Sequence, residues 1–211
     1  MQDYTTLMVL AGVAVFLLFK LKSVLGTKTG HEQPPASARR DLDEGAEVTP
    51  IQHPAEPVDE GPFADAFADM RRVEPDFSPT VFVSGARQAY EMLLMAFENG
   101  DKDTLQKFLS PDVFQGFAAV IDARADEGLT VDARFVGLRK TEIVGARFDP
   151  EDNVAEIDMS FIGELITVVR DSEHRVVEGD PNEVRREHDR WTFGRQLGAR
   201  DPNWLLIATG E

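Results

Sequence analysis

The sequence predicts an α+β domain in which helices come first and consecutive strands follow, behind an apolar N-terminal segment and a polar linker. Between residues 77 and 128, apolar side chains recur at helical spacing and are bounded by helix start and stop signals. Beyond residue 130 the pattern changes to short runs of strand character with alternating faces. Helices followed by consecutive strands favour helices that cover one face of an antiparallel sheet.

The bulk composition excludes several classes of function. The chain has 211 residues, a formal net charge of −16 and no cysteine. Such acidity argues against a general nucleic-acid binder, because phosphate backbones are bound by stripes of Lys and Arg, and it favours basic partners. The absence of cysteine excludes disulfides, thiolate zinc sites and cysteine nucleophiles.

Residues 1–26 are expected to form a single transmembrane anchor. Residues 7–19 are an unbroken apolar run of thirteen, which is shorter than the roughly 20 residues that span a bilayer, although flanking lysines can snorkel and extend it. Asp3 is the only charged side chain before the run, and three lysines follow it. The positive-inside rule therefore places the C-terminal side in the cytoplasm. A cleaved signal peptide or an interfacial helix are the alternatives. The expected anchor residues are Leu7, Val9, Leu10, Val13, Phe16, Leu17, Leu18, Phe19, Lys20 and Lys22.

Residues 27–61 have the composition of a linker. They are rich in proline and nearly lack large apolar side chains, and eight acids stand against three bases between residues 28 and 61. Such a segment buries too little apolar surface to offset its chain entropy. We therefore expect a disordered acidic tether between the anchor and the domain.

A short amphipathic helix is expected in residues 62–76. Phe63, Phe67 and Met70 recur near helical spacing in this segment. The helix would either pack on its own domain or use these side chains to dock a partner. The domain proper is expected to cover residues 77–211.

Three helices are predicted between residues 77 and 128, and each has its own start signal. Ser78 and Ser110 each precede a proline, which places serine at the N-cap and proline at the first helical position. Asp101 caps a short helix between them. Gly100 and Gly128 end the first and third helices.

The first of these helices carries the longest apolar stripe. Gly85 and Ala86 would allow close approach of another element, and Tyr90 is expected to place its hydroxyl at a rim. The stripe consists of Phe82, Ala86, Ala89, Tyr90, Leu93 and Phe97.

The second half of the chain predicts strands. Strand character appears around Phe135 and Ile143, and alternation over residues 153–171 places Ala155, Ile157 and Met159 on one face. Two more strands follow, in "EVRREHDRWTFGRQL" and "NWLLIAT". Proline and glycine mark the turns at residues 149–150, 179–181 and 201–203.

No catalytic, cofactor or metal site is predicted. His31 and His53 lie in the linker, and neither His174, in a turn, nor His188, on a charged strand, has a partner at metal-ligand spacing. The sequence has no phosphate-binding glycine loop and no G-x-S-x-G nucleophile elbow. The chain is therefore not expected to be an enzyme.

The remaining candidates are apolar side chains, which form either a filled core or the lining of a cavity or docking surface. A carrier would have an open cavity lined by Phe97, Phe117 and Trp191. An adaptor would expose an apolar patch, with residues of the 62–76 helix as candidates. The full set of candidate pocket or docking residues is Phe63, Phe67, Met70, Tyr90, Phe97, Phe117, Ile121, Trp191 and Phe193.

Residues 77–117, "FSPTVFVSGARQAYEMLLMAFENGDKDTLQKFLSPDVFQGF", resemble the opening of the Tim44-like domain family. That family is named for the inner-membrane adaptor of the mitochondrial import motor and has membrane-anchored bacterial relatives. The end of the chain, with its V-V-E-G-D-P, W-T-F and D-P-N-W motifs, looks like the family's ending, and the anchor is also similar. The residues that match the opening pattern are Phe77, Pro79, Phe82, Gly85, Ala86, Ala89, Tyr90, Glu91, Ala96, Phe97, Gly100, Asp101, Thr104, Leu105 and Leu109.

The resemblance implies N-terminal helices packed on a strongly bent antiparallel sheet, similar to the nuclear-transport-factor-two-like cone. It also implies a non-enzymatic adaptor or scaffold in protein translocation or membrane-protein assembly, which docks a protein partner at the cell inner membrane. That partner would be a translocon, insertase or chaperone, and membrane lipid would be contacted as well. No nucleic acid and no small-molecule substrate is expected.

Two other functions stay open at this point. One is a carrier or sensor that binds a lipid or apolar ligand in the cone, and the other is a small enzyme, because similar cones elsewhere host catalysis. The family's mitochondrial protein has a long basic region ahead of this domain, where the present chain has an acidic linker. The chaperone contact of that protein therefore does not carry over safely.

Overall fold

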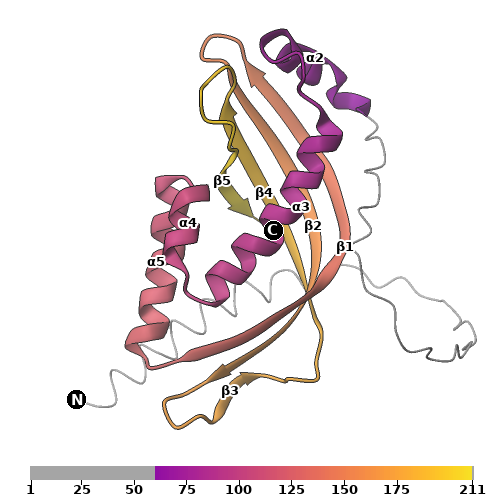
Figure 1. Ribbon diagram of the computed structural model, residues 1–211. Coiled ribbons are helices and arrows are strands. Elements are labelled where there is room, and N and C mark those ends of the chain that lie inside the picture. Colours follow the sequence, from indigo (N-terminus) through magenta and orange to yellow (C-terminus); the bar gives the residue numbers. More distant parts are fainter. Residues whose placement is uncertain (1–59, 211) are drawn as a thin grey trace, which may run out of the picture. The chain divides into compact units, whose positions relative to one another are not determined.

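The computed structural model describes residues 60–210, which form helices followed by an antiparallel sheet (Figure 1). This confirms the predicted α+β class. The expected anchor and residues 27–59 of the linker lie outside the described part. No helix within residues 60–210 is long and apolar enough to cross a membrane. The elements are η1 (Gly61–Phe63), α2 (Ala64–Val73), α3 (Pro79–Glu98), α4 (Lys102–Phe108), α5 (Pro111–Asp126), β1 (Thr130–Asp149), β2 (Val154–Arg170), β3 (Val176–Gly179), β4 (Arg185–Gln196) and β5 (Leu205–Gly210).

Helices α3, α4 and α5 begin at the capping residues that the sequence predicts. The Ser78 hydroxyl accepts from the Val81 N–H at 3.4 Å, and the Asp101 carboxylate accepts from the Thr104 N–H at 3.0 Å. The Ser110 hydroxyl caps α5 in the same way. Gly100 follows α3 with a φ of 69°, a left-handed conformation that glycine adopts without steric cost.

The sheet has the strand order β1-β2-β4-β5, and all of these pairs are antiparallel. The short strand β3 pairs with the end of β2 instead. Figure 1 shows β1 and β2 as one long hairpin that runs the length of the sheet. Strand β2 therefore lies at the centre of the sheet.

Strand β1 is a single strand of 20 residues, where the sequence had indicated two stretches of strand character. Its register against β2 shifts at three places, next to Val136, Arg139 and Val144. Each such bulge adds one residue to β1 and increases the local twist and bend of the sheet. Because every bulge also reverses the alternation of faces, a continuous bulged strand looks interrupted in the sequence.

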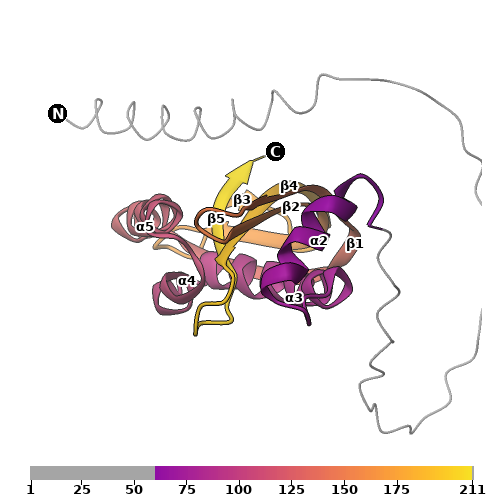
Figure 2. The same ribbon diagram turned by 90° about the horizontal axis from the view of Figure 1, so that it is seen from above.

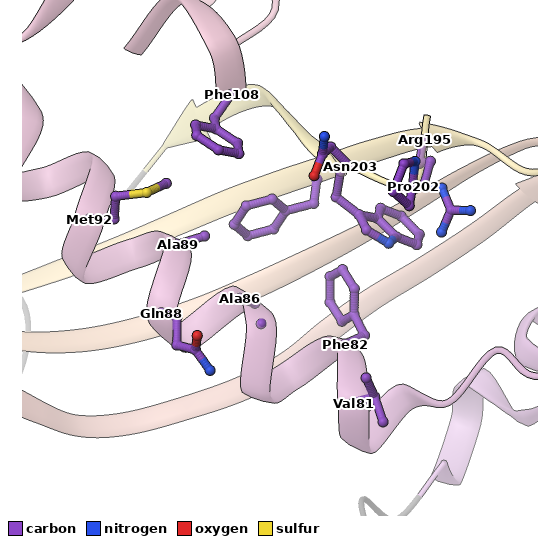
Figure 3. Close-up of a pocket in the computed structure, with 13 residues that line it drawn as sticks. Val81, Phe82, Ala86, Gln88, Ala89, Met92, Phe108, Arg195, Pro202 and Asn203 are labelled. Carbon is purple, nitrogen blue, oxygen red and sulfur yellow. The ribbon is translucent and has the colours of Figure 1, made fainter. Parts of the chain in front are cut away.

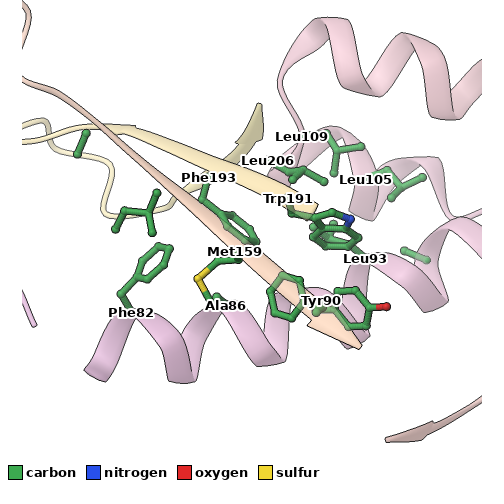
Figure 4. Close-up of a cluster of buried hydrophobic side chains, with 14 of the residues drawn as sticks. Phe82, Ala86, Tyr90, Leu93, Leu105, Leu109, Met159, Trp191, Phe193 and Leu206 are labelled. Carbon is green, nitrogen blue, oxygen red and sulfur yellow. The ribbon is translucent and has the colours of Figure 1, made fainter. Parts of the chain in front are cut away.

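The helices cover one face of the sheet and enclose the core (Figures 2 and 4). Ala155, Ile157 and Met159 on β2 are completely buried on this face, as the alternation predicted. The core cluster contains Phe67, Met70, Phe82, Ala86, Tyr90, Leu93, Ala96, Leu105, Leu109, Ile121, Ala155, Ile157, Met159, Phe161, Trp191, Phe193, Leu197 and Leu206.

Tyr90 lies at the centre of this core, and the expectation that its hydroxyl reaches a rim is wrong. The side chain is fully buried and its ring stacks on Phe161, with 4.5 Å between ring centroids. Its hydroxyl donates to the Asp189 carboxylate at 2.6 Å. A Cβ atom at Gly163 would lie 2.5 Å from the Tyr90 hydroxyl oxygen, so only glycine leaves room for the tyrosine.

Helix α2 packs on its own domain, and its apolar residues do not form an exposed docking patch. Phe67 and Met70 are fully buried, and the Phe67 ring lies 6.0 Å from that of Phe77. Glu74, at the end of α2, accepts from the Arg195 guanidinium and from the Gly198 N–H. The carboxylate of Glu74 thus ties α2 to β4 and to the segment that follows it.

The opposite face of the sheet carries two buried carboxylates that are neutralised by arginines. Asp158 accepts from Arg147 at 3.0 Å and from the Thr192 hydroxyl at 2.8 Å. Burial opposes ionisation of Asp158, but these hydrogen bonds hold its pKa below the usual range. Glu164 lies between Arg139 and Arg186, and its hydrogen bond with Arg139 lowers its pKa. Both buried charges are therefore paired.

Replacing Gly163 by alanine should destabilise the domain. The added methyl group would collide with Tyr90, and overpacking of this kind typically costs about 1–3 kcal/mol in the free energy of unfolding. Gly137→Ala on the neighbouring strand is the matched control, since no atom lies within 4 Å of its Cβ position. Urea denaturation measures both variants, and equal stabilities would show that Tyr90 does not need this space.

Alkaline pH should destabilise the domain through Tyr90. Burial, and then the nearby Asp189 carboxylate, raise the pKa of Tyr90 far above its usual value, which is about 10 in an unfolded chain. The resulting stability is fully present below that unfolded pKa and declines as the pH rises above it. The free energy of unfolding should therefore fall above about pH 10, and fall less steeply in Tyr90→Phe. Identical pH profiles for the two proteins would contradict this assignment.

Candidate functional site

A groove of about 650 Å³ lies between α3 and the loop of residues 197–204 that joins β4 to β5 (Figure 3). We call it the α3 groove. Its lining is mostly apolar and comes from α3, the end of α4, β4 and the loop. The lining residues are Val81, Phe82, Gly85, Ala86, Gln88, Ala89, Met92, Phe108, Phe193, Arg195, Pro202, Asn203 and Trp204.

One wall of the groove is a stripe of α3. Val81, Gly85 and Met92 follow one another at helical spacing on α3, and Met92 is half-buried and also packs against the core. Val81 is 70% exposed, the highest value among the large hydrophobic residues that the structure describes. No atom lies within 4 Å of a Cβ built on Gly85, so this glycine opens onto empty space.

The floor and the opposite wall are aromatic. Phe82 lies edge-on to Trp204 of the loop, with 4.8 Å between ring centroids, and edge-on to Phe193 of β4, at 5.9 Å. Phe108 at the end of α4 lies at the other end of the groove from Arg195 (Figure 3). These contacts fix the groove's shape, because the rings that line it are also packed on one another.

Arg195 is the one charged residue among those that line the groove. Its guanidinium binds Glu74 and lies 5.9 Å from the centre of the Trp204 ring. Its Nε atom is buried and has no hydrogen-bond partner within residues 60–210. A guanidinium offers five N–H donors in a fixed fork, so the 13% of the Arg195 side chain that stays exposed can bind a further acceptor while Glu74 stays in place.

The arrangement is suited to binding. Within the described residues, no three His, Cys, Asp or Glu side chains gather where they could hold a metal ion. His174 lies in a turn with a φ of 62°, and His188 is exposed on β4 outside the groove. What the groove offers is apolar surface, two amide side chains and one cation, which together can bind an amphiphilic partner.

Most of the residues expected to form a pocket do not line the groove. Phe193 does, whereas Tyr90 and Trp191 are buried in the core. Phe97 and Phe117 are half-buried and pack edge-on against each other at 4.8 Å, and neither of them lines the α3 groove. Phe63, Phe67, Met70 and Ile121 also belong to the core or pack against it.

Several lining residues were missed because their signal is weak or absent in the sequence. Val81 is an apolar side chain that stands outside the main stripe of α3, which is a detectable signal. Gly85 was identified as a place of close approach, although nothing occupies that space within residues 60–210. Trp204 and Asn203 lie in a loop, and no periodicity relates a loop to a helix more than 100 residues earlier.

Gly85→Ala should raise stability, because a helix-interior glycine costs roughly 0.5–1 kcal/mol relative to alanine and nothing here collides with the methyl group. Gly116→Ala in α5 is the matched control, because its Cβ position is equally open. Thermal unfolding should show similar gains for both variants. A loss of stability for Gly85→Ala alone would mean that the groove is packed at this point.

Comparisons with known proteins identify the family of this chain. The family model of the Tim44-like domain matches residues 63–211. The mitochondrial import inner membrane translocase subunit TIM44-1 of Arabidopsis thaliana is 23% identical over 149 residues, which are 68% of this chain but 31% of that protein. The chain thus spans less than a third of that relative's length.

A crystal structure of the intermembrane space region of the chloroplast protein ARC6 is also similar, with 16% identity and a TM-score of 0.39 over 61% of this chain and 89% of that one. The family match covers well over half of the present chain and includes every α-helix and strand described above. The chain therefore belongs to the Tim44-like domain family, as the resemblance in its sequence predicted.

Proposed function

We propose that this protein is a membrane-anchored adaptor in protein translocation or membrane-protein assembly. Residues 1–26 hold it in the cell inner membrane as a single-pass anchor, residues 27–61 act as a tether, and the Tim44-like domain faces the cytoplasm. The domain docks a protein partner and has no catalytic role. The observation that carries the proposal is the α3 groove, an open apolar site on a domain of this family.

The chemistry of the groove supports docking over catalysis. Its lining is mostly apolar, and Val81 on its α3 wall is 70% exposed. The groove's charged residue, Arg195, is held by Glu74, and no other ionisable side chain lines the groove. One of the similar proteins is a translocase subunit, so protein translocation is the process in which to look for a partner first.

A carrier of lipid or another apolar ligand is the second candidate. The groove's volume of about 650 Å³ is typical of small-molecule sites, which commonly measure roughly 300–1,000 Å³. Its position differs from the cavity that the sequence suggested, because it lies beside α3 and not within the core. The partner would then be membrane lipid, with the tether allowing the domain to reach the bilayer.

The first measurement is a crosslinking pull-down from membranes, which compares the full chain with a version that lacks residues 1–26. The adaptor proposal expects subunits of a translocon, an insertase or a chaperone to be enriched, and expects this enrichment to depend on the anchor. Enrichment of lipid alone, with no protein above the control, would overturn it in favour of the carrier.

A groove variant makes this experiment more specific. Gly85→Leu places a side chain into the open groove, and Gly116→Leu adds the same side chain to open space on α5. If the groove is the docking site, Gly85→Leu should lose the partner and Gly116→Leu should keep it. Equal recovery with both variants would move the docking site elsewhere on the domain.

A further inference from the structure

The chemistry of the partner can be inferred from the groove, on the assumption that the proposed adaptor function holds. The α3 wall runs from Val81 to Met92, which is about 16 Å at 1.5 Å per residue and corresponds to three helical turns. Its middle is formed by Gly85 and Ala89, one turn apart. Small residues at this spacing let a second helix approach the backbone of α3 closely.

An extended peptide does not suit the groove. Side chains line it, and the polar ones are limited to Gln88, Arg195 and Asn203. The backbone N–H and C=O groups of an extended chain would therefore lose water and find few partners, at a cost of about 1–3 kcal/mol for each unsatisfied group. A helix satisfies its own backbone groups and presents only side chains to the walls.

The position of Arg195 would set the orientation of a helix bound in the groove. Arg195 lies at one end of the groove, where its guanidinium is 5.9 Å from the centre of the Trp204 ring, and Met92 and Phe108 lie toward the other end (Figure 3). The guanidinium already binds Glu74, and its buried Nε has no partner within the described part of the chain. A second carboxylate placed here can accept from the exposed part of the guanidinium, whereas a cation offers it no acceptor.

We propose that the α3 groove binds an amphipathic helix of about three turns from the partner protein, with an Asp or Glu that meets Arg195. The helix lays apolar side chains at i, i+4, i+7 and i+11 against the stripe formed by Val81, Gly85 and Met92. Its acidic residue stands at the end beside Trp204. The site thereby selects for an acidic end and against a basic one.

The test uses the full chain reconstituted in phosphatidylcholine vesicles and a fluorescent alanine-based peptide of about 15 residues, long enough to form a helix. Leucines stand at i, i+4, i+7 and i+11, and a glutamate stands at one end. Fluorescence anisotropy should show saturable binding to the wild type and to Gly116→Leu. Gly85→Leu should weaken this binding by at least about tenfold. Absence of saturable binding, or equal binding by Gly85→Leu, would overturn the proposal.

Three control peptides test the helix and the charge separately. A central proline, which breaks a helix, should abolish binding, and so should scattering the leucines around the helix. Replacing the glutamate by glutamine should weaken binding severalfold, and replacing it by lysine should weaken it more. This charge test is made on the peptide because Arg195 also holds Glu74 in place. If the proline peptide binds as well as the original, the occupant is extended and the proposal fails.

The outcomes also separate this inference from the adaptor function itself. If Gly85→Leu still recovers protein partners from membranes but the peptides do not bind the wild type, the adaptor stands and the helical occupant is wrong. If a fluorescent fatty acid binds the wild type and Gly116→Leu but not Gly85→Leu, and the peptide cannot displace it, the groove belongs to lipid. In that case two proposals are overturned: that the groove binds a helix, and that the groove is the docking site of an adaptor.

Discussion

The contact between the Tyr90 ring and the backbone at Gly163 sets the distance between α3 and the sheet. The ring lies between Phe161 and Trp191, and its hydroxyl is fixed by Asp189. No side chain stands between the tyrosine and β2 at this point, so α3 approaches the strand as closely as its own aromatic ring allows. Every other core contact of α3 follows from this distance.

The same helix builds the groove, so the core and the candidate site are not independent. Phe82 and Ala86 face the sheet and also line the groove, while Gly85 opens onto it. A shift of α3 caused by a larger residue at Gly163 would change the groove's width as well. The link between Glu74 and Arg195 acts on the other wall, because it holds the end of α2 against β4 and the Gly198 backbone.

Features that depend on neighbouring residues could be predicted from the sequence, and features that depend on contacts between distant segments could not. The caps at Ser78, Asp101 and Ser110 are decided by hydrogen bonds within four residues, so they were predicted correctly. The continuity of β1 was hidden, since its bulges interrupt the alternation on which strand prediction depends. The groove was missed for a different reason. Val81 and Trp204 become neighbours only when the last loop folds over α3, and the pattern along either segment does not encode that distance.

Strand β5 is the last strand in chain order, and yet it completes the core. Leu206 is fully buried, and its carbonyl accepts from the Ser110 N–H at 2.9 Å, between α4 and α5. During synthesis on the ribosome, the helices and β1 to β4 emerge before the segment that fills this place and before Trp204, which closes the groove. A nascent chain therefore passes through a period in which its apolar inner face is uncovered and needs protection from aggregation. The α3 groove likewise lacks its Trp204 wall until that segment has folded into place.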